Sequence, residues 1–582
     1  MTTKKSYTKF YDSNSRFAVI DKKMQSFNYD GSGLLETLIT AQEVFGHLSN
    51  DLLAYVAKEL RLPLSQVWGV ATFYDKFKLD LSNTIDCQVC IGPVCEAAGA
   101  REILAHTCKH VGISEPGQSS DGKHRIEEVQ CLGLCDQAPA ALVNKKTQVQ
   151  ISKNDVPALL KGEAKEATVQ VRGKPRVLTA SINRLDPTDL ETHQLEGTFA
   201  PLEKAINEMT PSEIIKELKT SRLTGRGGAG FLTGLKWELA MEAADSTKYI
   251  VCNFDESEPG TFKDRVLMEG NPFSVIEGLM IGALAIGAKS GYIFIRNEYH
   301  KATSIVVEAI EKLYSAGLLG EHILGSEYDL DIEVRHSAGG YICGEETALF
   351  EAIEGKRGIP RIKPPYPTQT GLFGKPTVIN NVETLAVVPN LIEHGGEWFQ
   401  QWGTHQSVGL KLFCLSGDVN QPCVVEAPYG LTIRRLINEF GGGFVGNPQA
   451  ILIGGAAGGF LHPDWLDLPV THEDLRPLNV PVGSGAIMVF NQSVDLWKVV
   501  KNFANFFEHE TCGHCVPCRL GTKEINRLLD KINHGRGTFA DIQRIETIGE
   551  GMSKTCYCGL GLSVANPVLT FLHNIETSPW AV

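Results

Sequence analysis

Residues 225–237 read GRGGAGFLTGLKW, and the interpretation of this stretch decides which fold the chain adopts. Its first six letters match G-x-G-x-x-G, but a dinucleotide-binding fold requires a strand directly before that pattern. Residues 211–222 have the apolar spacing of an amphipathic helix instead, which disfavours that fold. A phosphate-binding P-loop is excluded as well, because Phe231 follows Gly230 where Lys and Ser or Thr would stand. Two interpretations remain: a turn that serves packing, or an anion cradle of backbone amides before a helix that begins near Thr233.

Three further polar loops follow in the same part of the chain. NFDESEPGTFKDR (253–265) comes after a predicted strand and therefore lies at the carboxyl edge of a sheet, where α/β folds bind ligands. RHSAGGYICGEETAL (335–349) has a second glycine turn before a helix, and residues 361–384 contain the runs RIKPPYP and GKPTVINNVET. Each loop alone could be a solvated turn, a helix start or a rigid connection. Four such loops, with the cations Arg226 and Lys236 beside the first, predict one shared ligand site.

The order of predicted elements indicates a multidomain α/β protein. Strands at 249–253, 292–295 and 330–334 alternate with helices at 233–244, 274–289 and 301–316, so a parallel or mixed sheet covered by helices is expected. Short strands dominate residues 408–490, which predicts a β-grasp-like domain. The predicted units are an N-terminal helical region (1–83), a small α/β domain (84–152), a polar connector (153–200), an α/β domain (201–395), the β-grasp domain (396–490) and a C-terminal helical bundle (491–582).

Composition excludes several classes of protein. The chain has 582 residues, of which 43% are apolar, so several packed domains are expected. The net charge of −13 disfavours nucleic-acid binding, whose footprint would be basic. The longest uncharged apolar run, near 279–288, is too short to span a bilayer, so no direct membrane insertion is expected. The N-terminal MTTKKSYTKF lacks the apolar core of a signal peptide, and we therefore expect a cytoplasmic protein.

The fifteen cysteines are strongly clustered, as metal or redox sites are in a reducing compartment. Cys512, Cys515 and Cys518 have the spacing C-x₂-C-x₂-C, and the distant Cys558 can complete a set of four ligands. An iron–sulfur cubane and a closed zinc site both fit this set. A second group comprises Cys87, Cys90, Cys95, Cys131 and Cys135. Within it, Cys87-x₂-Cys90 also matches a thioredoxin-like redox motif, so a disulfide pair is an alternative to a cluster.

The four polar loops together resemble the flavin- and NADH-binding subunit of respiratory NADH:quinone oxidoreductase, over residues 200–582. The resemblance implies bound FMN, with NADH stacked on the flavin. The residues that it implies in contact with FMN are Gly225, Arg226, Gly227, Gly228, Lys236, Asn253, Asp255, Glu256, Ser257, Tyr341, Glu345, Asn380, Asn381 and Thr384. Those that it implies in contact with NADH are Phe231, Glu258, Glu346, Lys363 and Tyr366, with Gly230 in the same cofactor loop and Glu258 and Glu346 in catalytic roles. Two positions depart from the family pattern, Leu232 in place of Pro and Phe254 in place of a small residue.

The cysteine groups carry resemblances of their own. ETCGHCVPCRLG (510–521) is similar to the [4Fe–4S] loop of the same family, with Thr511 in place of the usual Ser; this implies Cys512, Cys515, Cys518 and Cys558 as ligands and Cys556 as a non-ligand. VCIGPVC (89–95), CLGLC (131–135) and the helical stretch 41–77 resemble the thioredoxin-like [2Fe–2S] subunit of that enzyme, over residues 15–145. That resemblance implies Cys90, Cys95, Cys131 and Cys135 as cluster ligands and leaves Cys87 as a spare thiol.

Fusion of these two subunits in one chain resembles the diaphorase (alpha) subunits of NAD-reducing, or bidirectional, nickel–iron hydrogenases. The resemblance implies reversible hydride transfer between NAD(H) and FMN, then one-electron transfer through iron–sulfur clusters. It also implies a hetero-oligomer with an iron–sulfur diaphorase small subunit and nickel–iron hydrogenase subunits. Three alternatives stay open: the diaphorase subunit of an NAD-dependent formate dehydrogenase, the soluble arm of a respiratory quinone reductase, and a zinc-stabilised scaffold without enzymatic activity.

Overall fold

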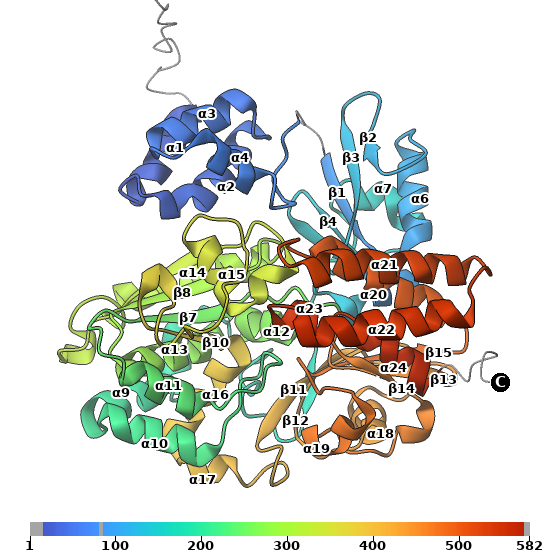
Figure 1. Ribbon diagram of the computed structural model, residues 1–582. Coiled ribbons are helices and arrows are strands. Elements are labelled where there is room, and N and C mark those ends of the chain that lie inside the picture. Colours follow the sequence, from blue (N-terminus) through green and yellow to red (C-terminus); the bar gives the residue numbers. More distant parts are fainter. Residues whose placement is uncertain (1–15, 81–84, 576–582) are drawn as a thin grey trace, which may run out of the picture.

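A computed structural model describes residues 16–80 and 85–575 of the chain (Figure 1). The N-terminal MTTKKSYTKF, where the sequence predicts no signal peptide, lies outside these residues. Among the described residues, no helix combines the length and the apolar character needed to cross a membrane. The largest buried apolar cluster runs from the N-terminal helices through the parallel-sheet unit to the C-terminal helices, whereas the small α/β unit and one face of the six-stranded sheet have buried clusters of their own.

The N-terminal region is helical, as predicted, and is drawn in blue at the top of Figure 1. It contains α1 (Arg16–Ser26), α2 (Leu34–Phe45), α3 (Asn50–Glu59) and α4 (Leu64–Ala71). Helix α2 ends at Gly46, whose φ of 82° few other residues adopt. The Ser49 hydroxyl then caps α3 by accepting a hydrogen bond from the Leu52 N–H.

The small α/β unit has a five-stranded sheet in the order β2-β3-β1-β4-β5. Its elements are β1 (Ile85–Cys90), α5 (Pro93–Ala97), α6 (Ala100–His110), β2 (Gly117–Gln118), β3 (His124–Val129), β4 (Ala140–Val143) and β5 (Lys146–Val149). Strands β1 and β3 are parallel, and the other pairs are antiparallel. Cys90 ends β1 and Cys131 follows β3, so this pairing brings two of the predicted ligands to one edge of the sheet.

The segment predicted as a polar connector contains secondary structure. Helix α7 (Val156–Leu159) follows the small α/β unit, and α8 (Leu190–Leu195) precedes the next one. Between them, β6 (Val171–Gly173) pairs in parallel with a strand of the third sheet, at the edge of that sheet. An edge strand keeps polar side chains in solvent, which explains why its sequence looks like a connection.

The third unit has a four-stranded parallel sheet in the order β10-β7-β8-β9, so the parallel alternative of the prediction is the one observed. The strands are β7 (Tyr249–Phe254), β8 (Ser290–Ile295), β9 (Asp331–His336) and β10 (Thr377–Asn381). The helices are α9 (Ala200–Glu208), α10 (Pro211–Ser221), α11 (Thr233–Met241), α12 (Lys263–Gly270), α13 (Pro272–Ile286), α14 (His300–Ser315), α15 (Glu346–Ile353), α16 (Val382–His394) and α17 (Gly396–Phe399). A helix, α10, precedes the glycine-rich turn, as the sequence predicts.

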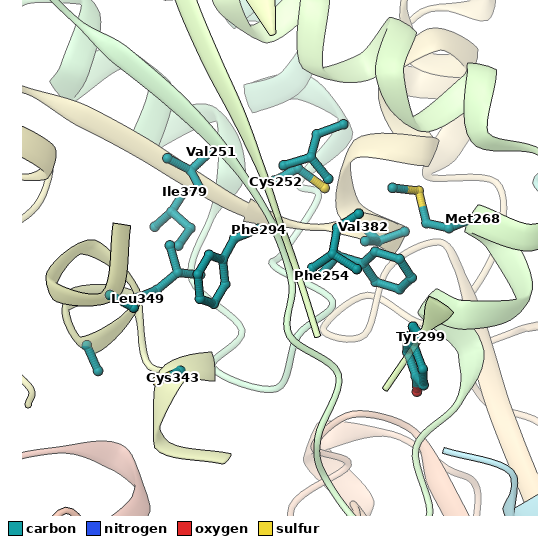
Figure 2. Packing of buried hydrophobic residues seen from close by; sticks show 14 of the residues in the cluster. Val251, Cys252, Phe254, Met268, Phe294, Tyr299, Cys343, Leu349, Ile379 and Val382 are labelled. Atoms are coloured by element: carbon teal, nitrogen blue, oxygen red, sulfur yellow. The ribbon is translucent and has the colours of Figure 1, made fainter. Parts of the chain in front are cut away.

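The core of this unit packs strand residues against helices on both sides of the sheet. Figure 2 shows Phe254 and Phe294 of neighbouring strands, with Leu349 of α15 and Met268 of α12 around them. Phe254 and Phe294 are fully buried, and each such side chain stabilises the fold by about 1.5–3 kcal/mol relative to exposure. Phe254, which replaces the small residue usual in the family, therefore belongs to the core.

The remaining units are a six-stranded sheet and a group of helices. The sheet has the order β14-β13-β15-β11-β12-β6 and contains β11 (Leu410–Gly417), β12 (Cys423–Pro428), β13 (Pro448–Ile453), β14 (Gly459–Leu461) and β15 (Ala486–Asn491), with the short helices α18 (Ile433–Arg435) and α19 (His472–Leu475). Its identification as a β-grasp domain stays a prediction. The last helices are α20 (Leu496–Glu510), α21 (Val516–Asn533), α22 (Phe539–Thr555), α23 (Gly559–Ser563) and α24 (Asn566–Asn574), and they lie between the small sheet and the six-stranded sheet (Figure 1).

Candidate functional site

A cavity of about 410 Å³ lies where the polar loops of the parallel sheet meet two later parts of the chain. The loops 227–229, 253–264 and 341–345 and Asn381 form one side of it. Loops of the six-stranded sheet (Gly454, Ala457, Pro481, Gly483, Ser484) and residues around α23 (Gly559, Leu560, Ser563, Asn566) form the rest. Its volume falls in the range of about 300–1,000 Å³ that is typical of ligand pockets.

The structure brings ten of the twenty predicted cofactor residues to this cavity. These ten are Gly227, Gly228, Asn253, Asp255, Glu256, Ser257, Glu258, Tyr341, Glu345 and Asn381. The other ten do not line it: Gly225, Arg226, Gly230, Phe231, Lys236, Glu346, Lys363, Tyr366, Asn380 and Thr384. Several of the second group support the first or stand at the rim.

The glycine-rich turn approaches its neighbours closely. A Cβ at Gly227 would lie 3.1 Å from Cβ of Asn381, and Gly228 has a φ of 115°. The Arg226 N–H donates to Thr384 Oγ1 over 2.8 Å, which fixes the turn to the start of α16. The Arg226 side chain points away from the cavity, because its buried guanidinium donates to the Val408 carbonyl over 2.8 Å and to the Tyr429 hydroxyl over 3.2 Å. These two acceptors lie beside strands of the six-stranded sheet. Because they hold the Arg226 side chain, this residue fixes the position of the glycine-rich turn.

The acidic loop holds one carboxylate that is free for a ligand. Burial raises the pKa of Asp255 to about 8, and its Oδ2 has no hydrogen-bond partner within the described part of the chain. Burial also raises the pKa of Glu256 to about 8, but this carboxylate accepts from the backbone N–H groups of Asp264 and Arg265 at 2.8 and 2.9 Å. Glu256 therefore fixes the start of α12. Glu258 is held by the six-stranded sheet, because the Ala457 N–H donates to its Oε1 over 3.1 Å.

A second group of predicted residues forms a charged rim. Lys363 Nζ lies 2.5 Å from Glu346 and 3.0 Å from Glu345, and Lys236 Nζ lies 3.9 Å from Glu346. Glu345 also caps α15 by accepting from the Thr347 and Ala348 N–H groups. The aromatic residues beside this rim, Phe231 and Tyr366, are 47% and 55% exposed, so their faces are open to a stacking partner. The remaining amide, Asn380, accepts a hydrogen bond from the Trp237 indole over 2.8 Å, and its contact with FMN stays a prediction.

Sequence reasoning missed a buried charge network under the cavity. Lys263 Nζ lies 2.6 Å from Asp264 Oδ1 and 3.1 Å from Glu383 Oε2, and Lys411 Nζ lies 2.6 Å from Glu383. Lys263 and Asp264 also hold the Asn381 amide, at 3.2 and 2.6 Å. The network orients a predicted FMN residue. Lys263 and Asp264 belong to the run KDR at the end of the acidic loop. The opposite charges in that run were the signal in the sequence that could have predicted an ion pair.

The cavity walls at 454–457 and 481–484 were also missed. These loops belong to the glycine-rich runs IGGAAGG (453–459) and PVGSG (481–485), each beside a strand of the six-stranded sheet. Gly455 has a φ of 84°, and a Cβ there would lie 2.4 Å from Cδ of Glu258. The glycine is therefore needed for the close contact with the acidic loop.

The N-terminal thiols lie together beside the acidic loop that lines the cavity. Cys90, Cys95, Cys131 and Cys135 are all buried, and the Cys131 and Cys135 sulfurs are 3.3 Å apart. Cys87 is buried in a third apolar cluster, apart from those of Cys90 and Cys95 and of Cys131 and Cys135, and its role as a spare thiol stays a prediction.

Two arginines of the parallel-sheet unit hold this cysteine loop in place. Arg296 donates to the Cys131 carbonyl and, over 3.0 Å, to the Glu256 carbonyl. Arg265 Nε donates to the Gly133 carbonyl over 3.0 Å. The cysteine loop is thereby fixed directly beside the acidic loop.

The C-terminal thiols lie beside the part of the cavity wall that Gly559 and Leu560 form. Cys515 and Cys518 are buried, and Cys512 and Cys558 are half-buried. The loop 511–518 and residues 556–558 bring the four predicted ligands together, with the Cys556 thiol beside them. Gly559 and Leu560, which directly follow Cys558, form part of the cavity wall. The predicted cluster ligand Cys558 is therefore the direct chain neighbour of a residue that lines the predicted flavin cavity.

The residues present fit the cofactors that the sequence implies. The cavity offers glycine backbone, the amide of Asn381 and the unpartnered Oδ2 of Asp255, which suit a polar flavin nucleotide. Each thiol group offers four cysteines, most of them buried, which suits an iron–sulfur cluster.

Replacing Asp255 with Asn should make thermal stability depend less on pH. The pKa of folded Asp255 is about 8 because of burial, whereas an unfolded Asp titrates near pH ~3.9. Between these values the folded chain holds a proton that the unfolded chain releases, so this stability is present at low pH and lost as pH rises to 8. Melting curves at about pH 5 and about pH 8.5 measure the difference. The control is Asp467→Asn, an exposed carboxylate paired with Arg434. An Asp255→Asn variant that destabilises with pH as steeply as the parent chain would contradict the assignment.

Three family models match the chain. The Nuo51 FMN-binding domain matches residues 218–390, the thioredoxin-like [2Fe-2S] ferredoxin matches 20–163, and the NADH-ubiquinone oxidoreductase-F iron-sulfur binding region matches 498–578. These matches confirm the cofactor set that the resemblance implied.

Similar proteins extend the comparison to whole chains. An NADH-quinone oxidoreductase subunit of Aquifex aeolicus is 45% identical over 64% of this chain and 86% of its own. NADP-reducing hydrogenase subunit HndC of Solidesulfovibrio fructosivorans is 41% identical over 70% and 84%. NAD-reducing hydrogenase HoxS subunit alpha of Cupriavidus necator is 33% identical over 94% and 92%. A solved structure of an NAD⁺-reducing [NiFe]-hydrogenase in its H₂-reduced state matches with a TM-score of 0.83 and 32% identity, over 95% of both chains.

Proposed function

Because the chain belongs to the family that contains this NADH-quinone oxidoreductase subunit and the alpha subunit of NAD-reducing hydrogenase, we propose that it is the diaphorase subunit of a hydrogenase. It is an oxidoreductase that uses NAD(H), FMN, one [2Fe–2S] cluster and one [4Fe–4S] cluster. The iron–sulfur match over 498–578 favours a cubane over the zinc site that the cysteine spacing left open.

One observation carries the proposal: the residues that line the predicted flavin cavity are joined directly to both thiol groups. Gly559 and Leu560 connect it to Cys558, and Arg296 connects its acidic loop to Cys131. FMN, when bound, accepts a hydride and releases single electrons. A site joined to both thiol groups suits that conversion from two-electron to one-electron chemistry.

The chain's own residues have the following proposed roles. The glycine turn and Asn381 bind the flavin nucleotide, and the buried lysine–carboxylate network keeps Asn381 oriented. Phe231 and Tyr366 provide exposed faces on which the nucleotide bases of NADH stack. Glu258 and Glu346 bind NADH. Cys90, Cys95, Cys131 and Cys135 hold the [2Fe–2S] cluster, and Cys512, Cys515, Cys518 and Cys558 hold the cubane.

The fused architecture favours a hydrogenase partner. The hydrogenase alpha subunit matches 94% of this chain, including the thioredoxin-like part, whereas the Aquifex protein matches 64%. Apolar side chains beside the cubane loop, Val516, Leu520 and Tyr557, are exposed. We assign this surface to the subunit that receives the electrons, an iron–sulfur diaphorase small subunit with nickel–iron chains beyond it. All fifteen cysteines lie in the described part of the chain and none of them is in a disulfide there, which fits a reducing cytoplasm.

Purification of the chain after expression with ample iron tests the function. We expect one FMN, iron equal to one cluster of each kind, and bleaching of the flavin absorbance by NADH under anaerobic conditions. A well-folded chain that retains no flavin, or whose flavin NADH does not bleach, would contradict the proposal. Identification of co-purified partners distinguishes a hydrogenase from a formate dehydrogenase or a quinone reductase.

A further inference from the structure

A hydroxyl group contacts one of the proposed cubane ligands. Thr511 Oγ1 lies 3.1 Å from Sγ of Cys518, which is 4% exposed. Thr511 caps the end of α20, and Cys518 lies in the first part of α21, so the two helices fix this contact. Because this sulfur is buried, few hydrogen-bond donors reach it from solvent.

The charge of the ligand sulfur determines the direction of this hydrogen bond. The Gly513 N–H donates to Thr511 Oγ1 over 3.3 Å and so occupies an acceptor position of the hydroxyl oxygen. A cluster-bound Cys518 is a thiolate without a proton to donate. The Thr511 hydroxyl is therefore the donor, and the Cys518 sulfur is the acceptor.

We propose that Thr511 raises the reduction potential of the cubane by donating this hydrogen bond to Cys518. The inference deepens the proposed function, on which it rests. An added electron makes the ligand sulfurs more negative, and a hydrogen bond to a charged acceptor is stronger than one to a neutral acceptor. The donor therefore stabilises the reduced cluster more than the oxidised one, since hydrogen bonds to the sulfurs help to set cluster potentials. Thr511 is a positioning residue that acts through a ligand.

Thr511→Val tests the proposal, because Val keeps the shape of Thr without the hydroxyl. We expect electron uptake by the cubane to weaken about tenfold, a fall in midpoint potential of about 59 mV for one electron. Anaerobic redox titration of the purified chain, followed by the electron paramagnetic resonance of the reduced cubane, measures this potential without turnover. Thr511→Ser retains the hydroxyl and should retain the parent potential.

Thr522→Val is the matched control. Thr522 is 2% exposed and lies one turn beyond Cys518, but its hydroxyl donates to the Cys518 carbonyl over 2.9 Å and not to the sulfur. The midpoint potential of the cubane in Thr522→Val should therefore equal that of the parent chain. An unchanged potential in Thr511→Val, or an equal fall in Thr522→Val, overturns the proposal.

Cluster assembly is checked by iron content in every variant. If Thr511→Val and Thr511→Ala both lose the cubane while Thr522→Val keeps it, the hydroxyl has a structural role and the tuning proposal is wrong. A parent chain without any cubane signal would instead contradict the proposed function, so the two failures are distinguishable.

Discussion

Replacing Cys515 with Ala removes the cubane and abolishes electron transfer from NADH to one-electron acceptors, while FMN stays bound. Cys515 is buried in the loop that precedes α21, beside Cys518. Loss of one thiolate leaves three of the four proposed ligands for the cluster. The flavin cavity receives no side chain from Cys515, so flavin retention should not change. Iron content, flavin content and reduction of an artificial acceptor by NADH measure the three effects.

Two comparisons make this result specific. Cys423→Ala removes a buried thiol from the six-stranded sheet and should retain both iron and activity. Cys515→Ala combined with Cys556→Ala excludes replacement by the neighbouring thiol, since Cys556 lies beside Cys515. Full iron content and full activity in that double variant would show that the ligand assignment is wrong.

Replacing Glu383 with Gln strongly destabilises the chain. Glu383 and Lys411 are fully buried, and Glu383 also accepts from the Leu412 N–H over 2.8 Å. The substitution keeps the shape but removes the negative charge between Lys411 and Lys263. Breaking a buried ion pair on one side costs about 3–5 kcal/mol, because an uncompensated charge stays in the interior. The free energy of unfolding at about pH 6.5, from denaturant titration, measures the loss.

The pH dependence of this loss identifies its cause. Burial lowers the pKa of Lys411 to about 8 even with Glu383 present. Without Glu383 the pKa of Lys411 falls further, so the lysine of the variant releases its proton below pH 8. The penalty in Glu383→Gln should therefore shrink as pH rises toward 8 and stay constant above it. Glu439→Gln, which breaks the exposed pair with Arg435, is the control and should cost between 0 and about 1 kcal/mol. A loss in Glu383→Gln as small as in this control would contradict the network.

The resemblance identified the family, and the matches confirm it, but the sequence could not define the whole cavity. The helix before the glycine turn was predicted from its apolar spacing, and α10 is present at 211–221. Periodicity reports local structure, and for that reason it located the strand that carries Asn253 but not β10, which carries Asn381. It contains no information on which distant loops close over them. The walls at Gly454–Ala457, Pro481–Ser484 and Gly559–Leu560 stand some 200 or more residues after the acidic loop, and only tertiary packing brings them there.

Side-chain direction was equally hidden from the sequence. Arg226 stands in the glycine turn, where a positive charge suggests a phosphate contact, yet its guanidinium binds acceptors of the six-stranded sheet. Those acceptors, Val408 and Tyr429, are about 180 and 200 residues away in the chain. The polar segment 153–200 illustrates the same limit, because β6 pairs with a strand that appears only after residue 420.

The hydrogen bonds of Arg265 and Arg296 limit which parts of this chain can change during evolution. Arg265 and Arg296 join the cysteine loop to the acidic loop through main-chain carbonyls, whose presence does not depend on residue type. The separation between the first redox centre and its neighbour is thus set by those two groups and not by the tether of residues 153–200. Exposed positions of residues 153–200, outside β6 and the backbone held by Glu426, can therefore change over evolutionary time while the spacing of the two loops stays constant.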